Sequence, residues 1–278
     1  MAKLKSNGYD VAVRQWHEHK SRTVVCLHGF TSSSATWEHV AQQLPDYRII
    51  GIDLIGHGET SAPVDAFNYS MEAQVSLLHD VLKQLDVQQF TLLGYSMGGR
   101  IALSYALAYP EQVEVLLLES ASPGLAHEHE RAARKKADDA LAARIEQYGV
   151  EAFVNEWERV PLFHSQASLP LNVQQAIRNE RLSQREIGLA NSLRGIGTGV
   201  QPSNWHRLDE LTMPVILLTG ELDEKFCLLA EKMQAFLAES AHIVVPNVGH
   251  AIHVENLTQF ATIVKEALQL TETKNLII

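Results

Sequence analysis

One serine lies where it could act as a nucleophile or a base. Ser96 is the centre of Gly94-Tyr-Ser-Met-Gly98, which follows a run of β-forming residues and precedes a helical pattern. In that strand–turn–helix context, Gly-x-Ser-x-Gly forms a sharp elbow that presents the serine hydroxyl at the edge of a sheet. The hydroxyl is weakly reactive by itself, so it needs a histidine to accept its proton and an acid to orient that histidine. The alternative is a serine that only shapes a turn.

Two residues far along the chain are suited to these partner roles. Asp223 lies just after a predicted strand over residues 215–219, and His250 lies just after the next predicted strand, over residues 243–245. Because open α/β sheets gather functional loops at the C-terminal ends of their strands, both side chains can reach the serine from one edge. The sequence therefore predicts a Ser96–His250–Asp223 set.

Other residues compete for the two partner roles. Of the 13 histidines, His28, His57 and His253 are interpreted as loop-shaping residues, because the partner of the serine should follow the last strand directly. Glu119 also follows a predicted strand and is the alternative acid. Chain order and loop position favour the aspartate, so we interpret Glu119 as a structural carboxylate.

Two backbone N–H groups are suited to stabilise developing negative charge. Met97 follows the serine at the N-terminal end of the predicted helix, where the helix dipole is positive. A second donor, the N–H of Phe30, is expected from the loop His28-Gly-Phe30, because this loop follows an early strand. The sequence has no HExxH or CxxC pattern, no carboxylate cluster and no Gly-rich nucleotide loop, so we expect neither a metal nor another cofactor.

The remaining pattern predicts the scaffold that positions these residues. Predicted strands cover residues 9–16, 23–27, 48–52, 90–94 and 113–118, and helical patterns cover residues 34–44, 71–85 and 97–109. Such alternation implies right-handed crossovers and a mostly parallel sheet with helices on both faces. Residues 17–20 are interpreted as a hairpin turn.

The pattern changes after the strand that ends near residue 118. Residues 122–208 are helical in pattern, rich in Ala, Glu, Gln and Arg, and contain no convincing strand. We expect an inserted helical cap over residues 122–208 and one core built from residues 1–121 and 209–278. The second part of the core should contribute the two late strands, a helix over residues 228–237 and a last helix over residues 257–270.

Composition limits the partners and the compartment. The formal net charge of −10 argues against a nucleic acid or an anionic membrane as the partner. No apolar run approaches the roughly 20 residues that span a bilayer, and the start of the chain lacks a signal-peptide pattern, so we expect a cytoplasmic protein without membrane insertion. Cys26 and Cys227 could form a disulfide, but two buried thiols in a reducing cytosol are the favoured interpretation.

These motifs together resemble a known family. The chain order Ser96, Asp223, His250 is that of α/β-hydrolases, which the chain resembles over nearly its whole length. The resemblance implies a mostly parallel eight-stranded sheet flanked by helices, with an inserted helical cap. Seven segments narrow it to the 2-succinyl-6-hydroxy-2,4-cyclohexadiene-1-carboxylate synthases of menaquinone biosynthesis; they cover residues 27–31, 94–100, 122–125, 130–134, 155–157, 161–163 and 220–226.

The resemblance implies a carbon–oxygen lyase on a hydrolase scaffold. Such an enzyme removes pyruvate from 2-succinyl-5-enolpyruvyl-6-hydroxy-3-cyclohexene-1-carboxylate, and the Ser96–His250–Asp223 set would act as the base without an acyl-enzyme. The substrate is a small polycarboxylate, and planar guanidinium groups bind carboxylates bidentately. No cofactor is implied.

The resemblance also implies which residues hold the substrate. They are Arg100, Arg134, Arg181, Tyr95 and Trp157. The first of these arginines follows the serine by four residues, which places it one helical turn further along the same side. Arg131, Arg178 and Arg185 are interpreted as an ordinary solvated helix surface, and residues 119–122 are given no contacts.

Two other functions are compatible with the motifs. A serine esterase or thioesterase would form an acyl-enzyme on Ser96, but a lipophilic ester needs an apolar pocket where Arg100 and the arginine-bearing cap lie. A binding protein on an inactive hydrolase fold is disfavoured because the serine, the histidine and the acid are all present. The lyase is the favoured prediction.

Overall fold

The computed structural model describes the backbone of residues 1–275 and the side chains of residues 1–269. Within it one eight-stranded sheet has the strand order β1-β2-β4-β3-β5-β6-β7-β8. The strands are β1 (Ala2–Ser6), β2 (Tyr9–Trp16), β3 (Thr23–Leu27), β4 (Arg48–Ile52), β5 (Phe90–Tyr95), β6 (Val113–Glu119), β7 (Val215–Gly220) and β8 (Ser240–Val245). From β4 to β8 along the sheet the neighbours are parallel, whereas β2 is antiparallel to both β1 and β4.

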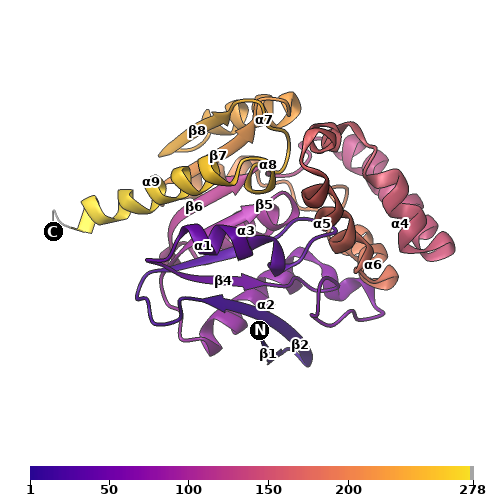
Figure 1. Cartoon of the computed structure of the whole chain (residues 1–278), viewed down its shortest axis with the longest axis horizontal. Coiled ribbons are helices and arrows are strands. Elements are labelled where there is room, and N and C mark those ends of the chain that lie inside the picture. The colour runs from indigo at the N-terminus through magenta and orange to yellow at the C-terminus, as the bar shows by residue number, and fades with distance from the viewer. Residues whose placement is uncertain (276–278) are drawn as a thin grey trace.

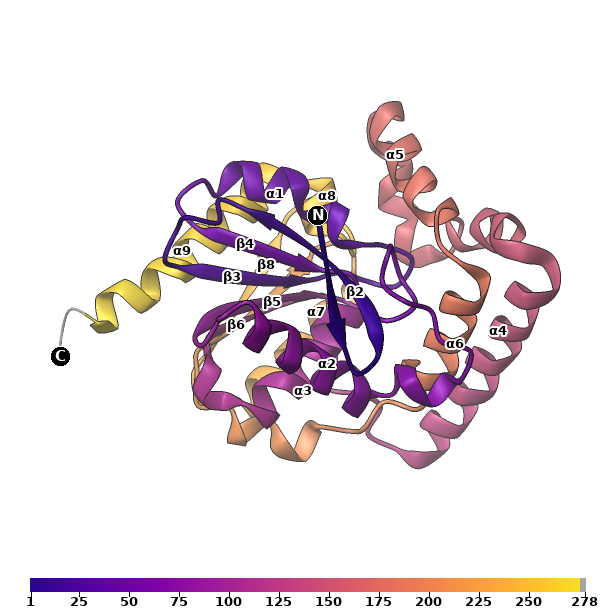
Figure 2. The same ribbon diagram turned by 90° about the horizontal axis from the view of Figure 1, so that it is seen from below.

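Helices cover both faces of this sheet (Figures 1 and 2). The α-helices are α1 (Glu38–Gln43), α2 (Met71–Gln84), α3 (Met97–Ala108), α4 (Glu128–Trp157), α5 (Leu171–Leu182), α6 (Glu186–Ile196), α7 (Glu224–Gln234), α8 (Ile252–Glu255) and α9 (Leu257–Asn275). Short 3₁₀ helices are η1 (Ser34–Trp37), η2 (Ala66–Tyr69), η3 (Pro110–Gln112), η4 (Pro161–Ser168) and η5 (Trp205–Glu210). Apolar side chains of α2, α3 and α7 pack on one face, and those of α1 and α9 pack on the other.

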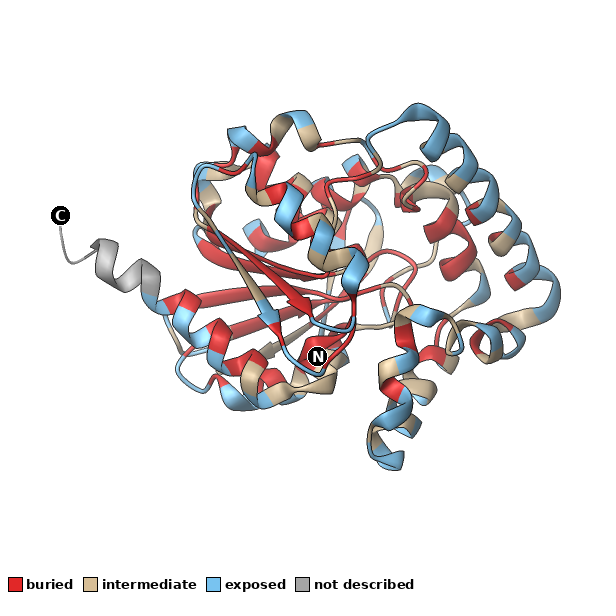
Figure 3. Ribbon diagram, turned by 90° about the horizontal axis from the view of Figure 1, so that it is seen from above, coloured by how far each residue is buried: buried red, intermediate tan, exposed pale blue. Residues whose placement is uncertain are grey.

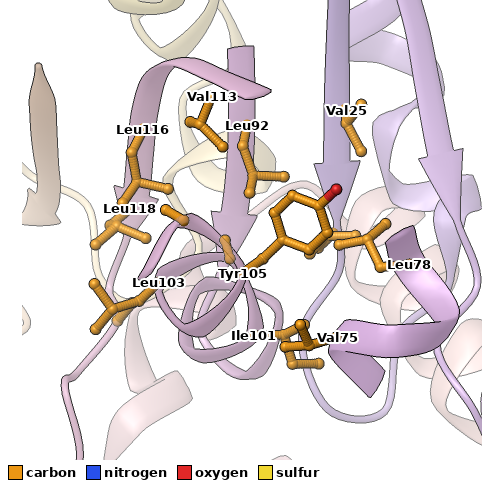
Figure 4. Packing of buried hydrophobic residues seen from close by; sticks show 14 of the residues in the cluster. Val25, Val75, Leu78, Leu92, Ile101, Leu103, Tyr105, Val113, Leu116 and Leu118 are labelled. Carbon is orange, nitrogen blue, oxygen red and sulfur yellow. The ribbon is translucent and has the colours of Figure 1, made fainter. Parts of the chain in front are cut away.

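The central strands are buried along their whole length. Every residue of β3, β5 and β7 is buried, which explains why these segments are continuous apolar runs rather than alternating ones (Figure 3). Figure 4 shows part of the core, where Leu103 of α3 lies beside Leu118 of β6, and the ring of Tyr105 lies between Leu92 of β5 and Leu78 of α2. This packing fixes α3, and with it the turn at its N-terminal end.

A helical insertion lies between β6 and β7, as the sequence predicts. Helices α4, α5 and α6 lie together at one end of the sheet, and much of the outer surface of α4 is exposed (Figures 1 and 3). Helix α4 is interrupted at Gly149, whose φ of 83° falls in the left-handed region. The bounds 122–208 of the cap stay a prediction.

Three expectations about local structure are wrong. The sequence reading missed β1, which pairs with β2 across Asn7 and Gly8, both with positive φ, as a type I′ hairpin turn requires. Residues 17–20 do not form a hairpin turn, because β2 pairs with β4 and not with β3. Helix α7 begins at Glu224 rather than residue 228, because Asp223 accepts a hydrogen bond from a backbone N–H of its first turn.

The last helix is longer than expected. It runs to Asn275, beyond the predicted end at residue 270, and residues 276–278 lie outside the described part of the chain. Among the described residues, no helix has the length and apolarity that crossing a membrane requires.

Candidate active site

Ser96 occupies a tight turn between β5 and α3. Its φ is 50°, an unusual value for a residue with a side chain, and its N–H donates to the carbonyl of Glu119 at 2.9 Å. The turn is possible because Gly98 brings α3 against β3, where a Cβ on Gly98 would overlap the carbonyl of Leu27. A Cβ on Gly94 would in turn lie 2.6 Å from the carbonyl oxygen of Gly98, so both glycines of the motif are needed for close backbone approach.

Gly98→Ala is expected to lower the free energy of unfolding by about 1–3 kcal/mol, because the added methyl meets backbone that cannot turn aside. Urea unfolding followed by circular dichroism measures this. Gly51→Ala in β4 is the matched control, since its Cβ would lie 3.0 Å from its nearest neighbour, Ser34, and should cost less. Equal unfolding midpoints for wild type and Gly98→Ala would contradict the close approach.

The three predicted residues of the triad lie together. His250 Nε2 is 3.0 Å from Ser96 Oγ, and His250 Nδ1 is 2.6 Å from Asp223 Oδ2. Only 1% of the histidine and 7% of the aspartate are exposed. When Nδ1–H donates to the carboxylate, Nε2 is left as an acceptor that faces the hydroxyl. This geometry permits proton transfer from Ser96 to His250.

The alternative acid has a different partner. Both carboxylate oxygens of Glu119 lie 2.9 Å from His253 Nδ1, and one of them accepts the His253 N–H at 3.0 Å. Glu119 is fully buried, so this pair fixes the chain where it continues beyond His250. Its placement agrees with the interpretation of Glu119 as a structural carboxylate.

Two further histidines shape buried loops. His28 Nε2 accepts the N–H of Leu54 at 3.0 Å, and His57 Nδ1 lies 3.2 Å from the carbonyl of Ile55. Burial lowers the pKa of both imidazoles, and the neighbouring His28 helps to lower that of His57 to about 3. Burial therefore favours the neutral form of both rings.

The triad opens into a cavity of about 230 Å³ between the core and the helical insertion. Its lining includes all the sequence-predicted site residues except Asp223 and Arg181, namely Phe30, Tyr95, Ser96, Met97, Arg100, Arg134, Trp157 and His250. Asp223 is outside it because the aspartate contacts the far side of the His250 ring. Phe30 and Met97 line the cavity beside Ser96, where the two proposed oxyanion donors would need to be.

Two arginines give this cavity positive charge. Arg100 donates through Nη1 to the carbonyl of Ile196 at 2.6 Å and to Gln201 at 3.1 Å, and Arg134 Nε is 2.7 Å from Asp138. Burial and the nearby charge of Arg134 lower the pKa of Arg100 to about 10. A guanidinium has five N–H donors, so those that these bonds do not use can bind a ligand. An anion between the two arginines would relieve their repulsion.

Comparison with known proteins identifies the family. Residues 22–257 match the α/β-hydrolase fold family. A 2-succinyl-6-hydroxy-2,4-cyclohexadiene-1-carboxylate synthase of Enterobacter sp. (strain 638) is 33% identical over 247 residues, covering 89% of this chain and 92% of its own. A Bacillus subtilis (strain 168) protein that carries the same name provisionally is 47% identical over 263 residues, covering 95% of this chain and 96% of its own. The chain belongs to this synthase family.

A solved structure agrees with this assignment. MenH from S. aureus superimposes with a TM-score of 0.90 and is 38% identical, over 94% of this chain and 98% of that one. The fold and the family resemblance predicted from the sequence are confirmed. Of the five residues that the resemblance implies for substrate binding, four line the cavity of the triad and one, Arg181, does not.

Arg181 lies apart from the other two arginines. It is 6% exposed, its Nη2 donates to Gln166 at 2.9 Å, and its guanidinium carbon lies 4.6 Å from the ring centroid of Phe163. It lines a separate cavity of about 40 Å³. Phe30, Tyr95 and Phe163 line both cavities and so form the wall between them. The structure does not bring Arg181 into the cavity of the triad.

The interpretation of three other arginines as solvated surface is wrong in part. Arg185 donates to the carbonyl of Thr60, and Arg178 bonds Glu158 at 2.7 Å. Arg131 holds two carbonyls just before α4, at 2.9 and 3.0 Å. The Arg185 bond joins the insertion to the core, the Arg178 bond joins two helices of the insertion, and the Arg131 bonds are local. Helical periodicity cannot reveal the first two, because they depend on the tertiary fold.

The synthase family motif also contains a residue that sequence reasoning left unassigned. Lys225 lines the cavity of the triad, with Nζ 5.4 Å from the ring centroid of Phe226, and that ring lies 4.7 Å from His250. A signal was present in Asp223-Glu-Lys-Phe226. It was left unassigned because the sequence pattern does not show that this side chain faces the cavity. Lys225 gives the cavity a third cation.

Proposed function

We propose that this protein eliminates pyruvate from 2-succinyl-5-enolpyruvyl-6-hydroxy-3-cyclohexene-1-carboxylate to give 2-succinyl-6-hydroxy-2,4-cyclohexadiene-1-carboxylate in menaquinone biosynthesis. The observation that carries the proposal is the Ser96–His250–Asp223 hydrogen-bond chain at a cavity with positive charge. Membership of the synthase family supports the choice of this reaction among those that the fold supports.

The substrate and the product define which bonds change. The ring double bond at position 3 becomes two at positions 2 and 4, so a proton leaves ring carbon 2 and the bond from carbon 5 to oxygen breaks. The enolpyruvyl group departs with the electron pair and, once protonated, becomes pyruvate. Carbon 2 carries the succinyl carbonyl, which makes its proton acidic and places the developing charge on the carbonyl oxygen.

The triad supplies the base in this proposal. Ser96 Oγ removes the ring proton while its own proton passes to His250 Nε2, and Asp223 holds the ring and stabilises the imidazolium. The N–H groups of Phe30 and Met97 bind the enolate oxygen, where aligned donors stabilise charge most effectively. No acyl-enzyme forms, and the atoms balance without a cofactor.

The cations bind the carboxylates in this proposal. The substrate has three carboxylates, on the ring, the succinyl chain and the enolpyruvyl group. Arg100 and Arg134 bind carboxylates at the triad cavity, and Lys225 adds a third charge there. Tyr95 and Trp157 form its walls. Arg181 remains a proposed contact, one that requires the aromatic wall to move.

A coupled assay tests the function. Purified protein is incubated with the cyclohexene substrate, and the pyruvate released is reduced by lactate dehydrogenase with NADH. We expect steady pyruvate release, and little turnover of an activated ester such as p-nitrophenyl acetate. Rapid ester hydrolysis with an initial burst, together with no pyruvate, would instead support a serine esterase.

Arg100→Ala is expected to lower kcat/KM for pyruvate release by about 10- to 150-fold, which corresponds to the roughly 1.5–3 kcal/mol of a hydrogen bond to a charged group. Arg100→Lys should recover only part of this, because an ammonium cannot bind a carboxylate bidentately. Arg131→Ala is the matched control, since Arg131 bonds two carbonyls outside the cavity. Unchanged kinetics in Arg100→Ala would remove its role.

We also propose a cytoplasmic location and a small-molecule partner. Two free cysteines, Cys26 and Cys227, support a reducing compartment. The formal net charge of −10 disfavours nucleic acid, so the positive cavity is the place where an anion would bind.

A further inference from the structure

The imidazole of the triad is carried by a segment without regular secondary structure. His250 lies between β8 and α8, and a base must hold its geometry to a fraction of an ångström. The ring itself is held by Asp223 and by the aromatic rings of Phe226 and Tyr95, at 4.7 and 5.4 Å between centroids. None of these contacts fixes the backbone from which the ring extends.

One carboxylate accepts hydrogen bonds from that backbone on both sides of the histidine. Glu255 Oε2 accepts the N–H of Gly249 at 2.7 Å, and Glu255 Oε1 accepts the N–H of Ala251 at 3.3 Å. The N–H of Glu255 donates in return to the carbonyl of Ala251 at 2.9 Å. The carboxylate therefore bridges the two residues that flank His250.

Both oxygens are needed for this bridge. Gly249 and Ala251 are buried, so their N–H groups require partners within the protein. A carboxylate offers an acceptor to each of them, and its charge strengthens both bonds. A glutamine has one acceptor oxygen, and its NH₂ group would face the second N–H as donor against donor. Replacement of the carboxylate by an amide should therefore leave one of the two N–H groups without its acceptor, so that the backbone on that side of His250 is no longer fixed.

We propose that Glu255 is a positioning residue, which fixes the backbone on either side of His250 so that Nε2 faces Ser96 and Nδ1 faces Asp223. Glu255 acts through His250 and does not touch the substrate. As far as pyruvate release is concerned, the proposal rests on the proposed function. The hydrogen-bond geometry of the triad does not depend on which substrate is turned over.

The test compares Glu255→Gln with Glu221→Gln. Glu221 is a matched control because its Oε2 accepts the N–H of Asn247 at 2.9 Å, at the exposed start of the same loop and away from His250. Four quantities are measured: kcat and KM for pyruvate release and the rate at which a small fluorophosphonate labels Ser96, all at 25 °C, and the melting temperature. The labelling rate reports the activation of Ser96 without the natural substrate.

For Glu255→Gln we expect kcat and the labelling rate to fall together by about 10- to 100-fold, since a misplacement near 1 Å can cost about that much, while KM stays within about twofold. Glu221→Gln should keep the wild-type kcat and labelling rate. If Glu255 is merely structural, the melting temperature falls but the folded variant keeps the wild-type labelling rate, and this result overturns the proposal.

A second variant keeps the test decisive if Glu255→Gln does not fold. Glu255→Asp retains the charge but is one methylene shorter, so it can reach only one of the two N–H groups, and its labelling rate should also fall. Wild-type labelling of folded Glu255→Asp would overturn the proposal. Failure of the wild-type protein to release pyruvate would reject the proposed function alone, because the labelling comparison still decides the role of Glu255.

Discussion

Replacement of Ser96 by alanine is expected to lower the rate of pyruvate release by about 10³- to 10⁴-fold, the scale on which a triad residue acts. The hydroxyl lies 3.0 Å from His250 Nε2, and in the proposed mechanism it takes the ring proton. Its loss leaves the cations of the cavity intact, so substrate affinity should change little. Single-turnover pyruvate release and a separate binding titration measure the two effects.

A control for this variant lies in the same cavity. Ser122 also lines it, but its hydroxyl accepts the N–H of Gly124 at 3.3 Å and has no histidine partner among the residues that the structure describes. Ser122→Ala should therefore retain pyruvate release within about threefold. Full activity of Ser96→Ala would contradict the proposed base and would favour direct proton transfer to His250.

The second large effect is expected for Asp223→Asn, which should lower kcat by about 10³- to 10⁴-fold. An asparagine amide can donate to His250 Nδ1, which leaves the proton on Nε2 and removes the acceptor that Ser96 needs. Fold stability should change much less, because Asp223 also accepts the N–H of Phe226 at the start of α7 and asparagine is an equally good cap.

Measurement of kcat for Asp223→Asn, beside thermal unfolding of the same sample, separates these two effects. An Asp223→Ala variant is the useful comparison, because it removes both the orienting acceptor and the cap and should lose stability as well. Retention of more than about one tenth of the wild-type kcat by folded Asp223→Asn would mean that another group orients His250. Glu119 is not available for this, since it is bonded to His253.

Two features of the sequence made much of the fold and the site predictable: a local motif and the order of the strands. Gly-x-Ser-x-Gly encodes its own turn, and parallel strands bring their C-terminal ends to one edge, so the order of strands was enough to bring Asp223 and His250 to Ser96. Strand β1 was not predicted, because it is a largely exposed edge strand. It carries Lys3 and Lys5, so its sequence shows no clear alternation of apolar and polar residues.

The parts that were not predictable depend on how the insertion packs. A helical pattern predicts that Arg181 lies on a helix, but it does not predict which residues the side chain contacts. In the structure these are Phe163 and Gln166. Lys225 was left unassigned because the sequence does not show which side chains of residues 220–226 face the cavity. The role of Glu255 could not be predicted either, because its partners are backbone N–H groups that only the folded loop brings together.

Two parts of the chain, the core and the helical insertion, line the cavity. Ser96, Asp223 and His250 come from loops that the sheet holds, whereas Arg134 and Trp157 come from the inserted helix α4. In the proposed mechanism the base comes from the core alone, whereas the cations that hold the substrate come from both parts of the chain, Arg100 and Lys225 from the core and Arg134 from the insertion. Exchange of the insertion for one with other side chains could redirect the same apparatus to a new compound, which fits a scaffold that hosts many chemistries.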